Sequence, residues 1–79
     1  MNAGPRGSQP DAVSGADLYL FKATSRLRLT YQIRLLTYAA ARQSGRLIIR
    51  TIPDCILSED MASFVMSNRE HVVVEPADR

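Results

Sequence analysis

Residues 46–52 have the sequence RLIIRTI, and the interpretation of the fold starts from this segment. It is rich in β-branched residues and lies between Gly45 and Pro53, two residue types that interrupt regular structure. Such a segment is typical of a buried β-strand. Residues 17–23, DLYLFKA, and residues 71–75, HVVVE, have the same character. The sequence therefore predicts three short strands.

The segments between these strands predict two helices. The first occupies residues 25–44, contains neither proline nor glycine, and is stopped by Gly45. Either Thr24 or Ser25 can act as its N-cap. The second helix begins after Ser58, whose hydroxyl can cap the free amide groups, and ends near residues 67–68.

The order strand, helix, strand, helix, strand predicts a small α/β domain of the βαβαβ type. We expect a three-stranded, mostly parallel sheet with both helices on one face. The direction of the third strand stays open because the second helix is short. Residues 1–16 are rich in glycine, proline and serine and are predicted to be a disordered tail, which leaves residues 17–79 as a single domain.

Each predicted strand carries apolar residues on both of its faces, whereas two helices can cover only one face of the sheet. A chain of 79 residues also has a small core, and such chains are usually stabilised by disulfides, a metal or a second subunit. Cys55 has no partner cysteine, and His71 is the only histidine. We therefore expect the uncovered face, or an open edge strand, to meet another molecule.

Charge is distributed unevenly along the chain, although the net charge is only +2. Residues 18–53 carry one lysine, six arginines and no acidic residue, and the six acids from Asp54 onward face only two arginines. Such asymmetry is typical of a surface for an anionic partner, or of two halves that neutralise each other.

The first predicted helix has two faces. Its core-facing set recurs at helical spacing and consists of Leu29, Ile33, Leu36 and Ala40. The second face is aromatic and basic and includes Leu27, with Leu35 and Arg28 at its margin; its candidate binding residues are Arg28, Tyr31, Arg34, Tyr38 and Arg42.

Three uses of this aromatic and basic face stay open. Its side chains can simply be solvated, as most charged side chains are. Tyrosine and arginine also anchor protein interfaces, which favours a homodimer or a contact with another protein. Arginines can neutralise phosphates while tyrosines stack on unpaired bases, so binding of nucleic acid is the alternative function.

Catalytic chemistry has weak support in the sequence. Cys55 follows the second strand, where ligands usually bind in α/β sheets, but no second cysteine forms a redox pair with it. A parallel sheet would place His71 at the opposite end from Cys55, which argues against a Cys-His pair. Ser58 is interpreted as a helix cap and alternatively as a phosphorylation site.

We therefore predict a non-enzymatic protein-interaction or regulatory module that self-associates, with a thiol enzyme centred on Cys55 as a further alternative. No metal or other cofactor is expected. The chain has neither the features of a secretory signal nor a stretch of about 20 apolar residues, so we expect a cytoplasmic protein that does not bind membranes.

Overall fold

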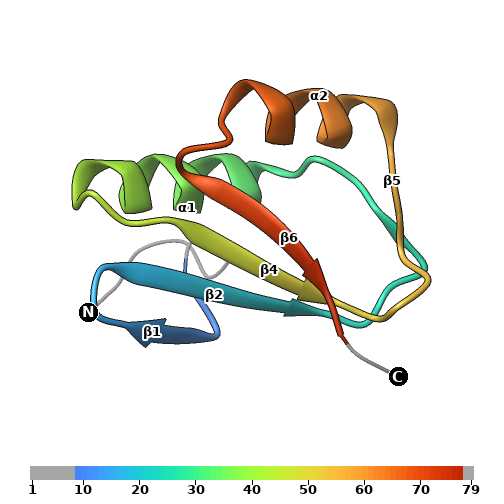
Figure 1. Cartoon of the computed structure of the whole chain (residues 1–79), viewed down its shortest axis with the longest axis horizontal. Helices are drawn as coiled ribbons and strands as arrows, with labels where there is room; N and C mark the ends of the chain where they lie inside the picture. The colour runs from blue at the N-terminus through green and yellow to red at the C-terminus, as the bar shows by residue number, and fades with distance from the viewer. Residues whose placement is uncertain (1–8, 78–79) are drawn as a thin grey trace.

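The computed structural model describes residues 9–77, which form a small compact α/β domain with two helices and a mixed sheet. Four strands form the main sheet in the order β1-β2-β4-β6, and both helices lie on the same face of it (Figure 1). The strands of this sheet are β1 (Ala12–Ser14), β2 (Asp17–Lys22), β4 (Leu47–Thr51) and β6 (Val72–Pro76). The other elements are β3 (Arg26–Leu27), α1 (Tyr31–Arg42), β5 (Ile56–Leu57) and α2 (Glu59–Ser67).

The three strands predicted from the sequence form the parallel part of this sheet. β2 pairs in parallel with β4, and β4 pairs in parallel with β6. The third strand, whose direction the sequence left open, is therefore parallel to the other two. Leu18, Leu47 and Val72 lie side by side in the register, as do Leu20, Ile49 and Val74 two positions further along. Because side chains alternate between faces, these six residues share the face toward the helices.

The prediction of a disordered tail over residues 1–16 is wrong for its final part. Residues 12–14 form β1, which pairs antiparallel with β2 and makes the sheet mixed. Gly15 and Ala16 connect the two strands, and Gly15 has a φ of 62°. Glycine takes such a φ without steric cost and is favoured at the first position of a two-residue hairpin turn. Residues 1–8 of the predicted tail lie outside the described residues.

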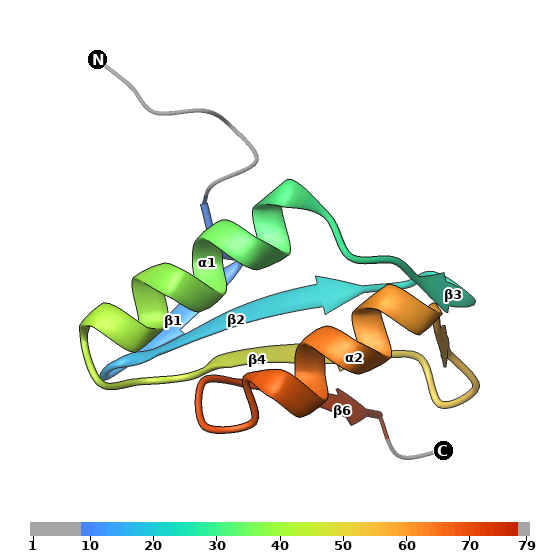
Figure 2. The ribbon, with the colours of Figure 1, turned by 90° about the horizontal axis from the view of Figure 1, so that it is seen from above.

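The prediction that the first helix begins at Thr24 or Ser25 is also wrong. α1 begins at Tyr31, and the side chain of Thr30 caps it by accepting a hydrogen bond from the Ile33 N–H at 3.2 Å. Arg26 and Leu27 instead form β3, which pairs in parallel with β5 in a separate two-stranded sheet (Figure 2). This pairing removes residues 26–27 from the helix and with them the first turn that the sequence predicts.

α1 ends as the sequence predicts, near residues 42–45, but the residue roles differ. Ser44, not Gly45, takes the left-handed conformation, with a φ of 61°. Its N–H donates to the Ala41 carbonyl at 3.1 Å, and the Gly45 N–H donates to the Ala40 carbonyl at 2.8 Å. These two bonds satisfy carbonyl groups that the last turn of a helix leaves unpaired.

α2 begins and ends where the sequence predicts. Ser58 is its N-cap, and the Ser58 Oγ accepts a hydrogen bond from the Met61 N–H at 3.3 Å. Glu59 and Asp60 lie in the first turn, where negative charge stabilises the helix dipole.

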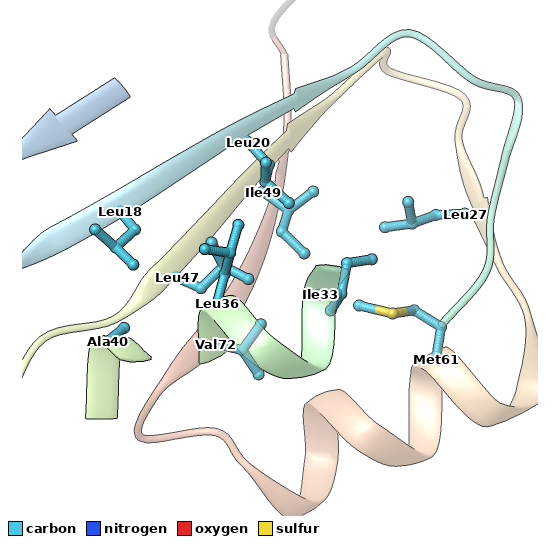
Figure 3. Close-up of a cluster of buried hydrophobic side chains, with 10 residues drawn as sticks. All are labelled: Leu18, Leu20, Leu27, Ile33, Leu36, Ala40, Leu47, Ile49, Met61 and Val72. Atoms are coloured by element: carbon cyan, nitrogen blue, oxygen red, sulfur yellow. The ribbon is translucent and has the colours of Figure 1, made fainter. Parts of the chain in front are cut away.

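The core lies between the sheet and the two helices (Figure 3). α1 contributes Ile33, Leu36 and Ala40, three of the four residues predicted to face the core, and Leu29 packs partly buried against them. From α2, Met61 reaches toward Ile33. Leu27 is 3% exposed and belongs to this core, so its predicted place on the aromatic and basic face is wrong.

Candidate interaction surfaces

The face of the main sheet that points away from the helices is the first candidate surface. The register places Tyr19, Ile48 and Val73 in one row across it and Phe21, Arg50 and Glu75 in the next. Ala12 pairs with Tyr19 at the sheet edge. We call these seven side chains the open sheet face, because no helix or strand of residues 9–77 lies over them (Figure 1).

The open sheet face partly shields itself. Ile48, at its centre, is only 4% exposed. The Arg50 guanidinium lies over the Tyr19 ring at 5.8 Å from its centroid, and Arg50 forms an ion pair with Glu75 at 3.5 Å. The exposed apolar area of this face is therefore smaller than the alternation of side chains along the strands predicts.

Phe21 is the main apolar group that this shielding leaves open, with 55% of its surface exposed. Its ring lies 6.5 Å from the Tyr19 ring, centroid to centroid. Both side chains border a shallow hollow of about 290 Å³ on the open sheet face, which Ala12 and Ser14 of β1 and Arg50 of β4 also line. An exposed aromatic group beside an apolar hollow is the arrangement that protein interfaces use as an anchor.

The two edges of the main sheet offer little backbone for pairing. At β6, the His71 carbonyl accepts from the Leu47 N–H, and the Ala77 N–H donates to the Thr51 carbonyl, both at 2.8 Å. Backbone groups alternate in direction along a strand, so those of Val72, Val74 and Pro76 point away from β4. The Val72 N–H is bonded to the Asn68 carbonyl at 3.0 Å, and proline has no N–H, so Val74 supplies the one outward donor of β6.

The other edge is blocked by different means. β1 has only three residues and covers only the first half of β2. Further along β2, the Phe21 N–H donates to the Asp11 carboxylate at 2.8 Å. A short edge strand followed by a carboxylate is poorly suited to pairing with another chain.

The outer side of α1 is the second candidate surface. Of the predicted binding residues, Tyr31, Arg34, Tyr38 and Arg42 lie on α1 and are exposed. At 100° per residue these four fall within one stripe, which we call the α1 stripe. Arg28 is exposed too but precedes the helix, so the structure does not place it on the helical surface.

Two side chains of the α1 stripe contact each other. The Arg42 guanidinium lies over the Tyr38 ring at 5.7 Å from its centroid, and its Nη1 donates to the Tyr38 Oη at 3.5 Å. Tyr31 and Tyr38 are 68% and 60% exposed, so both side chains are largely in contact with solvent.

The residues considered for catalysis lie apart. His71 is beside Gly45, with its Nδ1 3.3 Å from the Gly45 carbonyl oxygen, and thus lies before β4. Cys55 follows β4 at the other end, is partly buried against the core, and its Sγ lies 3.9 Å from the Ile56 carbonyl oxygen. A hollow of about 320 Å³ lies at the carboxyl ends of β2 and β4, but Cys55 does not line it.

Ser58 acts as the cap that the sequence predicts, and its hydroxyl also donates to the Asp60 carboxylate. This hydrogen bond from Ser58 is the main cause that holds the pKa of Asp60 below its usual value of 3.8. The Ser58 hydroxyl is thus engaged in both directions by the first turn of α2.

Phe21, Arg50 and Glu75 are absent from the predicted binding residues. A signal for them was present, since alternation along three parallel strands assigns residues 19 and 21, 48 and 50, and 73 and 75 to one face. The missing step was the register between the strands, which brings Arg50 next to both Phe21 and Glu75.

No helix within residues 9–77 is long and apolar enough to cross a membrane. A comparison of the chain with protein families, curated proteins and solved structures finds no match in any of the three.

Proposed function

We propose that the protein is a non-enzymatic interaction module that associates with a second copy of itself through the open sheet face. The observation that carries the proposal is Phe21, a large apolar side chain 55% exposed beside an apolar hollow. Burying this ring against a partner removes apolar surface from water, which is the main driving force for association.

The limited pairing capacity of both sheet edges favours association through the open sheet face over pairing of edge strands from two copies. Pairing along β6 would have outward carbonyls but a single outward N–H, that of Val74, and pairing along β1 would involve three residues. An extended sheet across two copies would gain few backbone hydrogen bonds in either case.

The size of the open sheet face limits the strength of the proposed association. Strands of about five residues are about 17 Å long, and four strands span about 19 Å, which gives at most roughly 320 Å² of flat area, since β1 has only three residues. Stable interfaces bury about 800 Å² per partner. We therefore expect a weak dimer whose dissociation constant lies in the high-micromolar range.

Sedimentation equilibrium tests the proposal. The wild-type chain should show an average mass that rises from 8.8 kDa toward twice that value as the concentration approaches about 1 mM. Phe21→Ser should stay monomeric over the same range. Tyr31→Ser, which removes an exposed aromatic ring from the other side of the molecule, is the matched control and should behave as wild type.

A wild-type chain that stays monomeric at about 1 mM contradicts the proposal. So does a Phe21→Ser chain that associates as strongly as wild type. Loss of association in Tyr31→Ser but not in Phe21→Ser would move the contact to the α1 stripe, which is the other surface predicted for self-association.

A further inference from the structure

We propose that the α1 stripe binds single-stranded nucleic acid, a function beyond self-association. The stripe presents two aromatic rings and two guanidinium groups in the order Tyr31, Arg34, Tyr38, Arg42 along one side of one helix. At a rise of 1.5 Å per residue, these positions span about 16 Å, a length that fits a short run of nucleotides.

The charge of this surface favours an anionic partner. α1 contains Arg34 and Arg42 and no acidic residue, not even in the first turn, where acids stabilise a helix. No acid occurs anywhere between Asp17 and Asp54 in the sequence. Arginines on such a surface can neutralise phosphates and release the counterions bound to them.

The tyrosine rings of the α1 stripe favour single-stranded nucleic acid over other anionic partners. An acidic peptide offers carboxylates but no flat faces, and a duplex hides the faces of its bases inside the helix. A single strand offers phosphates and unpaired bases together, and bases stack on exposed tyrosine rings regardless of sequence. The Arg42 guanidinium is already held beside the Tyr38 ring by two contacts, which places a cation next to a stacking surface.

This binding surface is independent of the proposed dimer. α1 buries Ile33, Leu36 and Ala40 toward the sheet, so its exposed stripe and the open sheet face lie on different sides of the molecule (Figure 1). A dimer formed through the open sheet faces would therefore leave the α1 stripe of each copy exposed.

Fluorescence anisotropy with a labelled single-stranded oligothymidine, recorded at several salt concentrations, tests this inference. We expect salt-sensitive binding that Tyr31→Ser weakens about fivefold and Tyr31→Phe, which keeps the ring, leaves unchanged. Arg34→Gln should reduce the slope of log affinity against log salt by about 0.7. Arg69→Gln, an exposed arginine after α2, makes the same change in net charge and should leave the slope unchanged.

Two competing ligands complete the experiment, a duplex of the same length and a polyglutamate peptide. The inference is overturned if the single strand shows no salt-sensitive binding at low salt. It is also overturned if either competitor binds as tightly and Tyr31→Ser has no effect, because the rings then contribute nothing. Phe21→Ser should bind the oligonucleotide like wild type, so failure of the dimer and failure of this inference are distinguishable.

Discussion

Gly15 and Gly45 lie close to each other in the fold, yet each is needed for a different reason. Gly15 has a φ of 62° in the β1–β2 turn, and a Cβ there would meet nothing within 4 Å. A Cβ on Gly45 would overlap the carbonyl oxygen of Ala16. That carbonyl also accepts a hydrogen bond from the Gln43 Nε2 at 2.8 Å, which holds it in place. Gly45 is thus required by close approach, Gly15 by backbone conformation.

These surroundings predict unequal costs for the same substitution. Gly45→Ala should lower the free energy of unfolding by about 3 kcal/mol or more, because a backbone segment has to move. Gly15→Ala, the matched control, should cost about 1 kcal/mol, the strain of a left-handed alanine. Urea unfolding measures both, and equal costs for the two variants would contradict the close approach at Gly45.

The N-termini of the two helices differ in how well the sequence predicts them. Ser58 was identifiable as a cap because two acids follow it directly, where negative charge stabilises the first turn of a helix. Thr24, Ser25 and Thr30 were all locally suitable as caps for α1. The choice of Thr30 depends on β3 pairing with β5, a contact between segments about 30 residues apart that no local pattern contains.

Dependence on tertiary contacts also explains why the short strands β1, β3 and β5 were not predicted from the sequence. The strands 17–22, 47–51 and 72–76 were predictable because each is long enough to show a β-branched or aromatic run. β1 has three residues, and β3 and β5 have two each. Segments this short are fixed by their tertiary partners rather than by composition.

The end of α1 supports a stabilising substitution. Ser44 has a φ of 61°, a conformation that glycine adopts without strain. Ser44→Gly should therefore raise the free energy of unfolding by about 0.5–1 kcal/mol. Ser63→Gly, inside α2, should lower it by about 0.5 kcal/mol. Thermal or urea unfolding of the two variants checks the prediction, and a loss of stability in Ser44→Gly would contradict the assigned helix end.

The start of α2 predicts a dependence of stability on pH. Because the pKa of Asp60 is lowered in the folded chain, the ionised carboxylate stabilises the fold. This contribution is complete above the usual pKa of 3.8 and is lost as the pH falls through the lower, folded pKa. Ser58→Ala should return the pKa of Asp60 toward 3.8, as measured by NMR titration of its carboxyl group. An unchanged pKa in Ser58→Ala would contradict the role of the Ser58 hydrogen bond.

At the scale of the whole molecule, the basic and acidic halves of the sequence meet at only part of the surface. Arg50 of β4 pairs with Glu75 of β6 on the open sheet face. On the opposite side, the exposed α1 stripe carries cations and no acid. Uneven charge in the sequence thus becomes two different surfaces, one partly neutralised and apolar, the other basic and aromatic.

The small size of the domain leaves one face of the sheet uncovered, which favours association with a second copy. Two helices cover one face of a four-stranded sheet, and residues 9–77 contain no further element that covers the other face (Figure 1). Self-shielding by Arg50 reduces the exposed apolar area without closing the hollow beside Phe21. A weak, concentration-dependent dimer is the association that this geometry favours.

The most direct test of the open sheet face is a dilution series followed by amide NMR spectra, from about 1 mM to about 10 µM. We predict concentration-dependent shifts for Tyr19, Phe21, Ile48 and Val73, with the resonances of α1 unchanged. Spectra that do not change over this range, or changes confined to α1, would contradict association through the open sheet face.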